Sequence, residues 1–275
     1  MLPSFDLVVA TVDRVAEPER LLDSLAQQTH RDFRVLLVDQ NADGRLDDLA
    51  PDLDVTRLRS SSRGLSRARN AALPLLAADL VAFPDDDCVL PPDLLERVAR
   101  RFAEESRLDG LTGRAAGADG RSSPSWATDA AVLTRENVWN RAISFTIFLR
   151  RDVVERVGPF DERLGLGAGS PWGSGEEIDL LVRAIDAGAR IEYDPGLVVV
   201  HEERHLSPGA LRQVGARDGA SVGYILRKHG YGPRTVARML VRPAGGALVA
   251  LARRDRARAA FHLSTLRGRV LGYRA

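Results

Sequence analysis

Short apolar runs alternate with helical patterns over the first two hundred residues, and this alternation limits the possible folds more than any other feature. The strand-like runs cover residues 7–11, 33–38, 55–58 and 80–83. Apolar residues at helical spacing separate or follow them, in residues 18–25, in residues 64–78 and after Pro92. Such alternation is typical of β-α-β units around a mostly parallel sheet. The sequence therefore predicts an α/β fold with a central sheet flanked by helices.

The second half of the chain is less regular and ends in helical patterns. The sequence predicts a mobile loop over residues 113–125, strands over residues 143–148 and 197–200, and a helix over residues 176–187. Within the pattern of residues 64–78, Pro74 is expected to interrupt the helix. Ser207 and Pro208 form an N-cap and N1 pair. After this pair the sequence predicts only helices, over residues 208–229, 235–241 and 247–265.

Composition excludes several classes of protein. A chain of 275 residues with 44% hydrophobic and 28% charged residues can bury a full core. Its one cysteine, Cys88, excludes an internal disulfide and a cysteine-based zinc cluster. No basic segment precedes the first apolar run, so no secretory signal is expected. No uninterrupted run of about 18 apolar residues occurs, so we expect a cytoplasmic protein without a membrane-spanning helix.

Three consecutive carboxylates, Asp85, Asp86 and Asp87, directly follow a strand-like run. In an open α/β sheet, ligands bind beyond the carboxyl ends of the strands, where Asp39 and His201 are also expected. Adjacent carboxylates repel one another unless a cation or water offsets their charge. Mg²⁺ or Mn²⁺ suits oxygen ligands and can also hold a diphosphate. A solvated acidic turn is the alternative, and the pattern alone leaves the two open.

Two further groups of charged residues stand where helices begin. Arg67 and Arg69 could hold phosphates together with free backbone N–H groups, or lie exposed on a helix. Glu176 and Glu177 follow a glycine-rich loop, and one of them could be a general base. The helix dipole alone would also favour acidic residues there. Asp179, next to apolar leucines, predicts structural hydrogen bonds.

His201 and Arg204 follow the last strand-like run. His201 could ligate a metal or contact a phosphate, and Arg204 could neutralise phosphate charge, while a structural histidine is the alternative. Trp172 could be an apolar platform for a sugar ring or an anchor of its glycine-rich loop. Cys88 has no histidine near it in sequence and predicts a small core residue.

Several short motifs follow one another along the chain. They lie at residues 11–14 (Thr-Val-Asp-Arg), 38–39 (Val-Asp), 64–70 (Gly-Leu-Ser-Arg-Ala-Arg-Asn), 83–87 (Phe-Pro-Asp-Asp-Asp), 157–162 (Val-Gly-Pro-Phe-Asp-Glu), 175–180 (Gly-Glu-Glu-Ile-Asp-Leu) and 200–202 (Val-His-Glu). None is specific alone, but in this order they resemble family 2 glycosyltransferases, inverting enzymes of the nucleotide-diphospho-sugar transferase (GT-A) fold. The resemblance implies a GT-A domain over residues 1–205, followed by a basic, amphipathic helical extension over residues 206–275.

The resemblance also implies roles for single residues. The implied nucleotide-binding residues are Thr11, Asp13, Asp39, Arg67, Arg69, Asp85 and Asp86. The implied metal ligands are Asp85, Asp87 and His201. Asp39 would contact the base, and Asp85 would lie near the ribose. Glu177 aligns with the catalytic base, with Glu176 beside it as the alternative. Trp172 and Arg204 would contact the acceptor or a phosphate.

The function implied by this resemblance is the transfer of a sugar from a UDP, dTDP or GDP donor to an acceptor hydroxyl, with inversion and with Mn²⁺ or Mg²⁺. The acceptor would be a glycan, a lipid-linked molecule or a small molecule, in polysaccharide, cell-envelope glycan or glycolipid synthesis. A non-catalytic nucleotide-sugar binding protein is one alternative. A sugar nucleotidyltransferase is another, although residues 10–16 lack the Gly- and Arg-rich phosphate signature of that chemistry. No nucleic acid partner is expected.

The net charge of +1 conceals an asymmetry. From residue 227 onward twelve Lys and Arg accompany one Asp, a net charge of +11, so the preceding part carries −10. The basic segment mixes its arginines with apolar residues such as Leu248 and Phe261. Its helices could lie on an anionic membrane surface at the cytoplasmic face. They could also pack on the catalytic domain or on a second subunit of a homodimer, and the sequence leaves these possibilities open.

Overall fold

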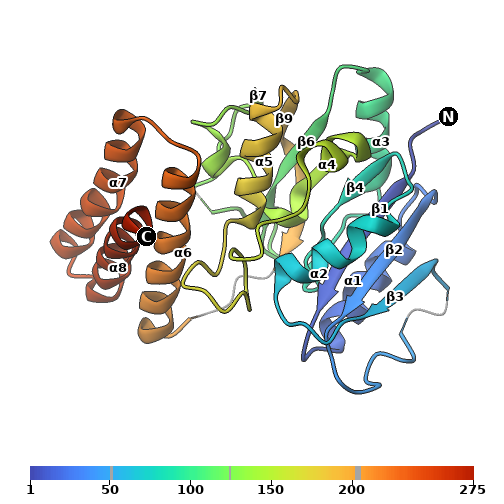
Figure 1. The fold of residues 1–275 in the computed structure, drawn as a ribbon, viewed down its shortest axis with the longest axis horizontal. Coiled ribbons are helices and arrows are strands. Elements are labelled where there is room, and N and C mark those ends of the chain that lie inside the picture. The colour runs from blue at the N-terminus through green and yellow to red at the C-terminus, as the bar shows by residue number, and fades with distance from the viewer. Residues whose placement is uncertain (50–51, 124, 202–205) are drawn as a thin grey trace. The chain divides into compact units, whose positions relative to one another are not determined.

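The structure, a computed structural model, describes residues 1–49, 52–123, 125–201 and 206–275. The strands within these ranges form one sheet in the order β3-β2-β1-β4-β8-β6-β9-β5, with β7 beside β9 (Figure 1). They are β1 (Phe5–Thr11), β2 (Phe33–Asp39), β3 (Val55–Arg59), β4 (Leu80–Ala82), β5 (Cys88–Val89), β6 (Gly110–Ala116), β7 (Ala131–Val132), β8 (Ile147–Arg150) and β9 (Ile191–His201). The sheet is parallel from β3 to β4 and mixed beyond β4. The predicted α/β fold is confirmed.

Helices flank the sheet and form the C-terminal part of the described chain (Figure 1). They are α1 (Ala16–Ala26), α2 (Leu65–Ala72), α3 (Leu94–Glu104), α4 (Arg151–Val157), α5 (Glu176–Asp186), α6 (Pro208–Lys228), α7 (Pro233–Ala252) and α8 (Arg256–Arg274). α1 buries Leu21 and Leu25, and α3 buries Leu95 and Val98, in the same apolar core as the strands. The helical spacing of these residues puts them on one face of each helix, which is why both helices pack on the sheet.

The chain divides into two compact units, and each is described by itself. The first, called the sheet unit, consists of Met1–Arg63, Arg67–Phe160 and Leu180–Glu203. The second, called the helical unit, consists of Gly64–Ser66, Asp161–Asp179 and Arg204–Ala275. The helical unit thus groups the glycine-rich loop before α5 with the C-terminal helices. The domains expected over residues 1–205 and 206–275 stay a prediction.

The central strands are buried and end at a common edge. β1 buries Phe5 and Leu7 completely, as the apolar run predicts. Its register with β2 puts Thr11 opposite Asp39, so both strands end together. Asp85, just beyond β4, forms a parallel bridge with Ala10. Polar side chains from three strand ends therefore meet at the carboxyl edge of the sheet, where ligands bind in open α/β sheets.

The loop predicted over residues 113–125 is partly a strand, because β6 extends to Ala116. A Cβ at Gly110 would lie 2.6 Å from the side chain of Leu149, and one at Gly113 would overlap the backbone carbonyl of Leu197. Glycine therefore lets β6 approach its neighbours closely, and the ladder with β9 shifts register at this point. The prediction was wrong for residues 113–116, because glycine here marks a close backbone approach and not a turn, whereas residues 117–123 form no helix or strand.

The strand predicted over residues 143–148 is wrong in its first half. Ser144–Thr146 forms a short 3-10 helix, η3, and β8 begins only at Ile147. The hydroxyl of Thr146 donates hydrogen bonds to the backbone carbonyls of Gly113, at 3.1 Å, and Ile143, at 3.0 Å. The local bond to Ile143 stabilises a turn, and the bond to Gly113 ties this turn to β6, neither of which the apolar pattern of the segment reveals.

Two prolines affect their helical segments differently. α2 ends at Ala72, and the 3-10 helix η1 (Leu73–Leu75) contains Pro74, so the predicted interruption is confirmed. Pro243, in contrast, lies inside α7, which continues to Ala252. A proline removes one backbone hydrogen bond from a helix interior but need not end the helix. The helix end predicted at residue 241 is therefore wrong.

The helix predicted over residues 247–265 is also wrong, because a helix boundary lies within it. α7 ends at Ala252 and α8 begins at Arg256. Asp255 is the N-cap of α8, and its side chain accepts a hydrogen bond of 2.9 Å from the backbone N–H of Arg258. A capping aspartate is a helix-start signal that apolar periodicity does not register.

α7 is long and apolar enough to cross a membrane by length and composition, contrary to the expectation. Its mean hydropathy reaches 1.3 over an 18-residue window. The expectation depended on uninterrupted apolar runs, and Arg238 and Arg242 interrupt this one. Core helices of soluble proteins have similar length and composition, so no membrane-spanning role is assigned to α7.

Within the helical unit, α8 packs against both α6 and α7. The contact with α6 depends on glycines spaced four residues apart, which are Gly215, Gly219 and Gly223 of α6 and Gly268 and Gly272 of α8. A Cβ at any of these positions would overlap the backbone of the facing helix. The two backbones therefore touch, as in helix pairs with small residues at every fourth position.

Candidate functional site

Strand pairing brings Asp85, Asp87 and His201 together. The chain leaves β4 at Ala82, turns through the acidic residues and continues as β5, which pairs antiparallel with the end of β9. In this ladder Cys88 lies opposite His201, so Asp87 precedes the residue that pairs with the histidine. The ladder thus joins side chains that lie 114 positions apart in the sequence.

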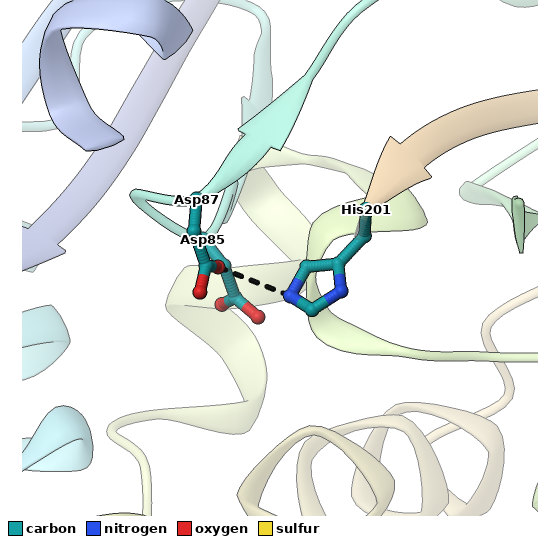
Figure 2. A group of neighbouring side chains, drawn as sticks. All are labelled: Asp85, Asp87 and His201. Carbon is teal, nitrogen blue, oxygen red and sulfur yellow. Dashed lines mark hydrogen bonds and ion pairs between the residues drawn. The ribbon is translucent and has the colours of Figure 1, made fainter. Parts of the chain in front are cut away.

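The three side chains face one another (Figure 2). One oxygen of each carboxylate and one imidazole nitrogen all lie within 4.8 Å of one another. His201 Nε2 and Asp87 Oδ1 are 3.0 Å apart. The structure therefore gathers the three residues that the sequence analysis named as metal ligands.

Asp85 is held in place by two side chains. Its Oδ1 accepts hydrogen bonds from Arg69 Nη2, at 3.0 Å, and from the hydroxyl of Ser144, at 3.1 Å. Arg69 is only 1% exposed, and its guanidinium lies over the rings of Phe83 and Phe160. Arg69 therefore orients a candidate metal ligand, while its contact with a nucleotide stays a prediction.

Asp86 and Asp87 share the guanidinium of Arg14. Arg14 Nη1 donates to Asp86 Oδ1 and, at 2.8 Å, to Asp87 Oδ2. Burial raises the pKa of Asp86. Burial alone would also raise the pKa of Asp87, but the hydrogen bond and charge of His201, with the charge of Arg14, outweigh it and lower that pKa. The ring of Phe145 stacks on His201, with 4.9 Å between centroids, and fixes the plane of the imidazole.

The donor set of Asp85, Asp87 and His201 fits a divalent cation. Carboxylate oxygens are the ligands that Mg²⁺ and Mn²⁺ prefer. An imidazole nitrogen also suits Mn²⁺, which is a transition metal. For ion–ligand distances of about 2.1 Å, atoms on opposite sides of one ion lie about 4.2 Å apart. The span of 4.8 Å therefore needs only small side-chain shifts to close around an ion.

Asp39 is fully buried at the end of β2, and both of its oxygens have protein partners. Oδ1 accepts hydrogen bonds from the backbone N–H and the side-chain amide of Asn41, at 2.9 and 2.7 Å. Oδ2 accepts two hydrogen bonds from Arg57. Burial would raise the pKa of Asp39, but these bonds and the charge of Arg57 lower it. The expected contact of Asp39 with a nucleobase stays a prediction.

Asp13 lies beside this network. Its backbone has a φ of 58°, in the left-handed region, and its N–H donates to Asn41 Oδ1 at 2.7 Å. Its carboxylate pairs with the exposed Arg63 at 2.9 Å. Arg67 donates to the carbonyl of Arg63 at 3.0 Å. Asn41 thus connects the ends of β1 and β2, and the expected roles of Asp13 and Arg67 in nucleotide binding stay predictions.

In the helical unit, a glycine-rich loop leads into α5. Four glycines of the loop have positive φ values: Gly165, Gly167, Gly169 and Gly175. Other residues rarely adopt this conformation. Glu176 is buried, and a Cβ at Gly165 would lie 3.2 Å from its carboxylate, whereas Glu177 is partly exposed. Glu177 is therefore the more accessible of the two candidate bases.

Asp179 makes the structural contacts that the sequence predicts. It is fully buried, and its Oδ1 lies 2.5 Å from Lys228 Nζ and 2.8 Å from His229 Nε2. Lys228 also contacts Asp161 Oδ2 at 2.9 Å, and the hydroxyl of Tyr224 donates to the same oxygen at 3.0 Å. The network therefore ties both ends of the segment Asp161–Asp179 to α6.

Trp172 stacks on Tyr224 of α6, with 4.1 Å between centroids and 20° between planes. This contact is the one expected if Trp172 anchors its loop. The alternative interpretation, a platform for a sugar ring, stays a prediction. Arg204 lies outside the described residues. Cys88 is buried, as predicted, and burial raises the pKa of its thiol.

Several residues around the site were not identified from the sequence: Arg14, Asn41, Arg57, Ser144 and Phe145. Asn41 follows Asp39 by two residues, the spacing of an Asx turn, and this signal could have found it. The other four act through contacts between distant segments, which spacing along the chain does not show.

The family model described as "Glycosyl transferase family 2" matches residues 6–158. The match covers more than half of the chain, which belongs to this family. Two similar proteins are the "Pre-mycofactocin glycosyltransferase" of Mycobacterium tuberculosis (strain CDC 1551 / Oshkosh) and the "PGL/p-HBAD biosynthesis glycosyltransferase" of Mycobacterium bovis (strain BCG / Pasteur 1173P2). The first is 29% identical over 202 residues (69% of this chain, 39% of the relative), the second 28% over 169 residues (58% and 64%). The chain thus spans less than two thirds of the length of either relative.

Solved structures share the fold. A mannosyltransferase from Pyrobaculum calidifontis, in complex with GDP-Man and Mn²⁺, matches with a TM-score of 0.66 at 18% identity, over 99% of this chain and 87% of its own. S. aureus TarS 1-349, in complex with UDP-GlcNAc, matches with a TM-score of 0.61 at 19% identity, over 96% and 90%. The expected glycosyltransferase domain of GT-A fold is therefore confirmed.

Proposed function

We propose that this chain transfers a sugar from a nucleotide-diphospho-sugar to an acceptor hydroxyl, with inversion at the anomeric carbon. The observation that carries the proposal is the convergence of Asp85, Asp87 and His201 at the carboxyl edge of the sheet of a family 2 domain. A diphosphate binds divalent cations strongly, so this site suits a metal-bound diphosphate. The structural neighbours in complex with GDP-Man and with UDP-GlcNAc support a donor of this class.

The donor's nucleoside would lie where β1 and β2 end. Thr11 and Asp39 stand opposite each other there, and Asn41 links Asp39 to the backbone of Asp13. In this proposal Asp39 contacts the nucleobase, and Asp85 and Asp86 face the ribose. Arg67 and Arg69, near the start of α2, are suited to the diphosphate because guanidinium groups form charged hydrogen bonds to phosphate.

A divalent ion, Mn²⁺ or Mg²⁺, held by Asp85, Asp87 and His201 would supply positive charge to the departing diphosphate. The protein's own part is to keep these ligands in place. Arg69 fixes Asp85, and Arg14 occupies Asp87 Oδ2. Asp87 Oδ1 thereby stays directed towards His201 Nε2.

The proposed base is Glu177. Its carboxylate would take the proton of the acceptor hydroxyl while that oxygen bonds to the anomeric carbon and the bond from this carbon to the diphosphate oxygen breaks. A single displacement inverts the anomeric centre. The partial exposure of Glu177 supports this role, and the burial of Glu176 makes it the second choice.

Transfer is tested by incubating the full chain with UDP-, dTDP- and GDP-sugars, Mn²⁺ and a panel of acceptors, and by measuring nucleoside diphosphate release and the anomeric configuration of the product by NMR. Glu177→Gln should lower the rate by about 10²–10⁴-fold and leave nucleoside diphosphate binding unchanged. Glu155→Gln, a surface carboxylate on α4, is the matched control. Full transfer by Glu177→Gln would exclude it as the base, and donor binding without transfer to any acceptor would indicate a binding module.

Membrane contact and glycolipid synthesis complete the proposal. α7 exposes 53–68% of Val241, Leu248, Val249 and Leu251 in the basic part of the chain, a combination that favours binding to anionic lipid surfaces. One relative is named for PGL/p-HBAD biosynthesis, which supports a role in glycan or glycolipid synthesis. The helical extension over residues 206–275 would then bring the catalytic domain to its acceptor. Failure to bind anionic liposomes at low salt would contradict the membrane contact.

A further inference from the structure

A groove of about 760 Å³ runs along α6 and α8 within the helical unit. We call it the α6–α8 groove, and neither the donor site nor the proposed base uses it. Trp172, from the glycine-rich loop, and Leu271, from α8, are part of its wall. Its volume lies within the range of about 300–1,000 Å³ that small-molecule sites have.

The floor of the groove consists of small residues. Ala216 and Ala220 of α6 line it together with Gly268 and Gly272 of α8. Because these two helices touch through their backbones, no large side chain fills the space between them. The floor is therefore a smooth apolar strip along the helix pair, and a hydrocarbon chain can make continuous van der Waals contact with such a strip.

The groove also carries positive charge. Arg212 and Arg217 of α6 and Arg267 of α8 line it, and no Asp or Glu does among the described residues. Arg217 pairs with Asp218 at 2.9 Å. Arg212 and Arg267 have no ion-pair partner within the described parts of the chain, and both are exposed. An apolar strip beside two unneutralised guanidinium groups complements a ligand that joins an apolar chain to an anion.

The groove is connected to the proposed chemistry through its wall. Trp172 is stacked on Tyr224 and stands five positions before Glu177 in the same segment of the helical unit. Leu271, which also lines the groove, is 54% exposed, so the apolar surface continues outwards from the groove. A ligand lying in the groove is therefore held beside the loop that leads to the proposed base.

We infer that the α6–α8 groove binds the acceptor, and that this acceptor is a hydroxyl compound carried on a lipid phosphate. The hydrocarbon chain lies on the Gly and Ala floor, and the phosphate accepts hydrogen bonds from Arg212 and Arg267. The inference rests on the proposed function and narrows its acceptor from any hydroxyl compound to one carried by an isoprenoid phosphate or a diacylglycerol phosphate.

The test is direct binding to the full chain, measured by calorimetry without any sugar donor. The probe is farnesyl phosphate below its critical micelle concentration, compared with farnesol and with inorganic phosphate. We expect farnesyl phosphate to bind more tightly than either. The double variant Arg212→Gln/Arg267→Gln should weaken this binding at least about tenfold. Arg234→Gln/Arg253→Gln removes one exposed arginine of α7 and one directly after it, both outside the groove, and is the matched control, which should bind normally.

A second variant tests the apolar floor. Ala216 is exposed and lines the groove, so Ala216→Phe should fill the floor without disturbing the core, and should block farnesyl phosphate while the melting temperature stays unchanged. Equal weakening by both arginine pairs, equal binding of farnesol, or no binding of farnesyl phosphate would overturn the inference. Because the assay omits the donor, these outcomes are independent of nucleoside diphosphate binding, which tests the proposed function separately.

Discussion

Gly223 of α6 offers the sharpest structural test of the helical unit. A Cβ at this position would lie 2.6 Å from the backbone nitrogen of Tyr273 and 2.9 Å from the carbonyl carbon of Arg269, both in α8. The carbonyl oxygen of Arg269 would be closer still, and ordinary contacts begin at 3.4 Å, so Gly223→Ala must separate the two backbones by at least about 0.8 Å. Overpacking of this kind costs about 1–3 kcal/mol, and the better helix propensity of alanine returns only about 1 kcal/mol.

The matched control is Gly245→Ala, in the interior of α7, where an added Cβ meets nothing within 4 Å. At this position only the helix propensity changes, because alanine favours a helix more than glycine does. We therefore expect stabilisation by about 0.5–1 kcal/mol. Urea unfolding followed by far-UV circular dichroism measures both variants. The predicted result is opposite signs, with Gly223→Ala less stable than Gly245→Ala by about 1–3 kcal/mol. Stabilisation by Gly223→Ala would refute direct backbone packing between α6 and α8.

Three further predictions concern buried charges and the thiol. Asp179→Asn removes the charge of a fully buried carboxylate that pairs with the exposed Lys228, and should destabilise the chain by about 1–3 kcal/mol in urea unfolding, whereas Asp152→Asn, at an exposed pair, should cost under about 0.5 kcal/mol. Equal effects would contradict the network around Lys228. Burial alone would raise the pKa of Asp161, but hydrogen bonds from Arg163 and Lys228 lower it below the ordinary value of 3.8. Its stabilising effect should therefore be complete above that pH and disappear as the pH falls below it, so the stability difference from Asp161→Asn should shrink in acid and not in base. The buried thiol of Cys88 should react with Ellman's reagent only as fast as the chain unfolds, and rapid labelling of the folded chain would contradict its burial.

The sequence predicts the first half of the sheet well, because each strand there is an apolar run of ordinary length bounded by polar turns. It fails where the structural reason is a contact between distant segments. Gly113 belongs to β6 because the backbone of β9 passes close to it, and nothing in the neighbouring residues indicates this. β5, with two residues, is too short to recognise. β5 nevertheless positions Asp87 beside His201, through its pairing with β9.

The candidate site likewise has residues that the local sequence predicts and residues that only contacts between distant segments explain. Asp85, Asp87 and His201 stand next to strand-like runs, so their place at the carboxyl edge could be predicted from topology alone. The side chains that hold them, such as Arg14 and Phe145, come from other segments and were found only in three dimensions. A ligand's chemical type is therefore visible in the sequence, while its orientation depends on tertiary contacts.

The central claim is that Asp85, Asp87 and His201 hold a divalent ion that binds a nucleoside diphosphate. Its most direct test is calorimetric binding of UDP, dTDP and GDP to the full chain with Mn²⁺ and with EDTA, for the wild type and for Asp87→Asn. Asp119→Asn, in an exposed loop, is the control. We predict that at least one nucleotide binds only with Mn²⁺, and that Asp87→Asn weakens this binding at least about tenfold while Asp119→Asn does not. Equal affinity in EDTA and in Asp87→Asn would contradict the account.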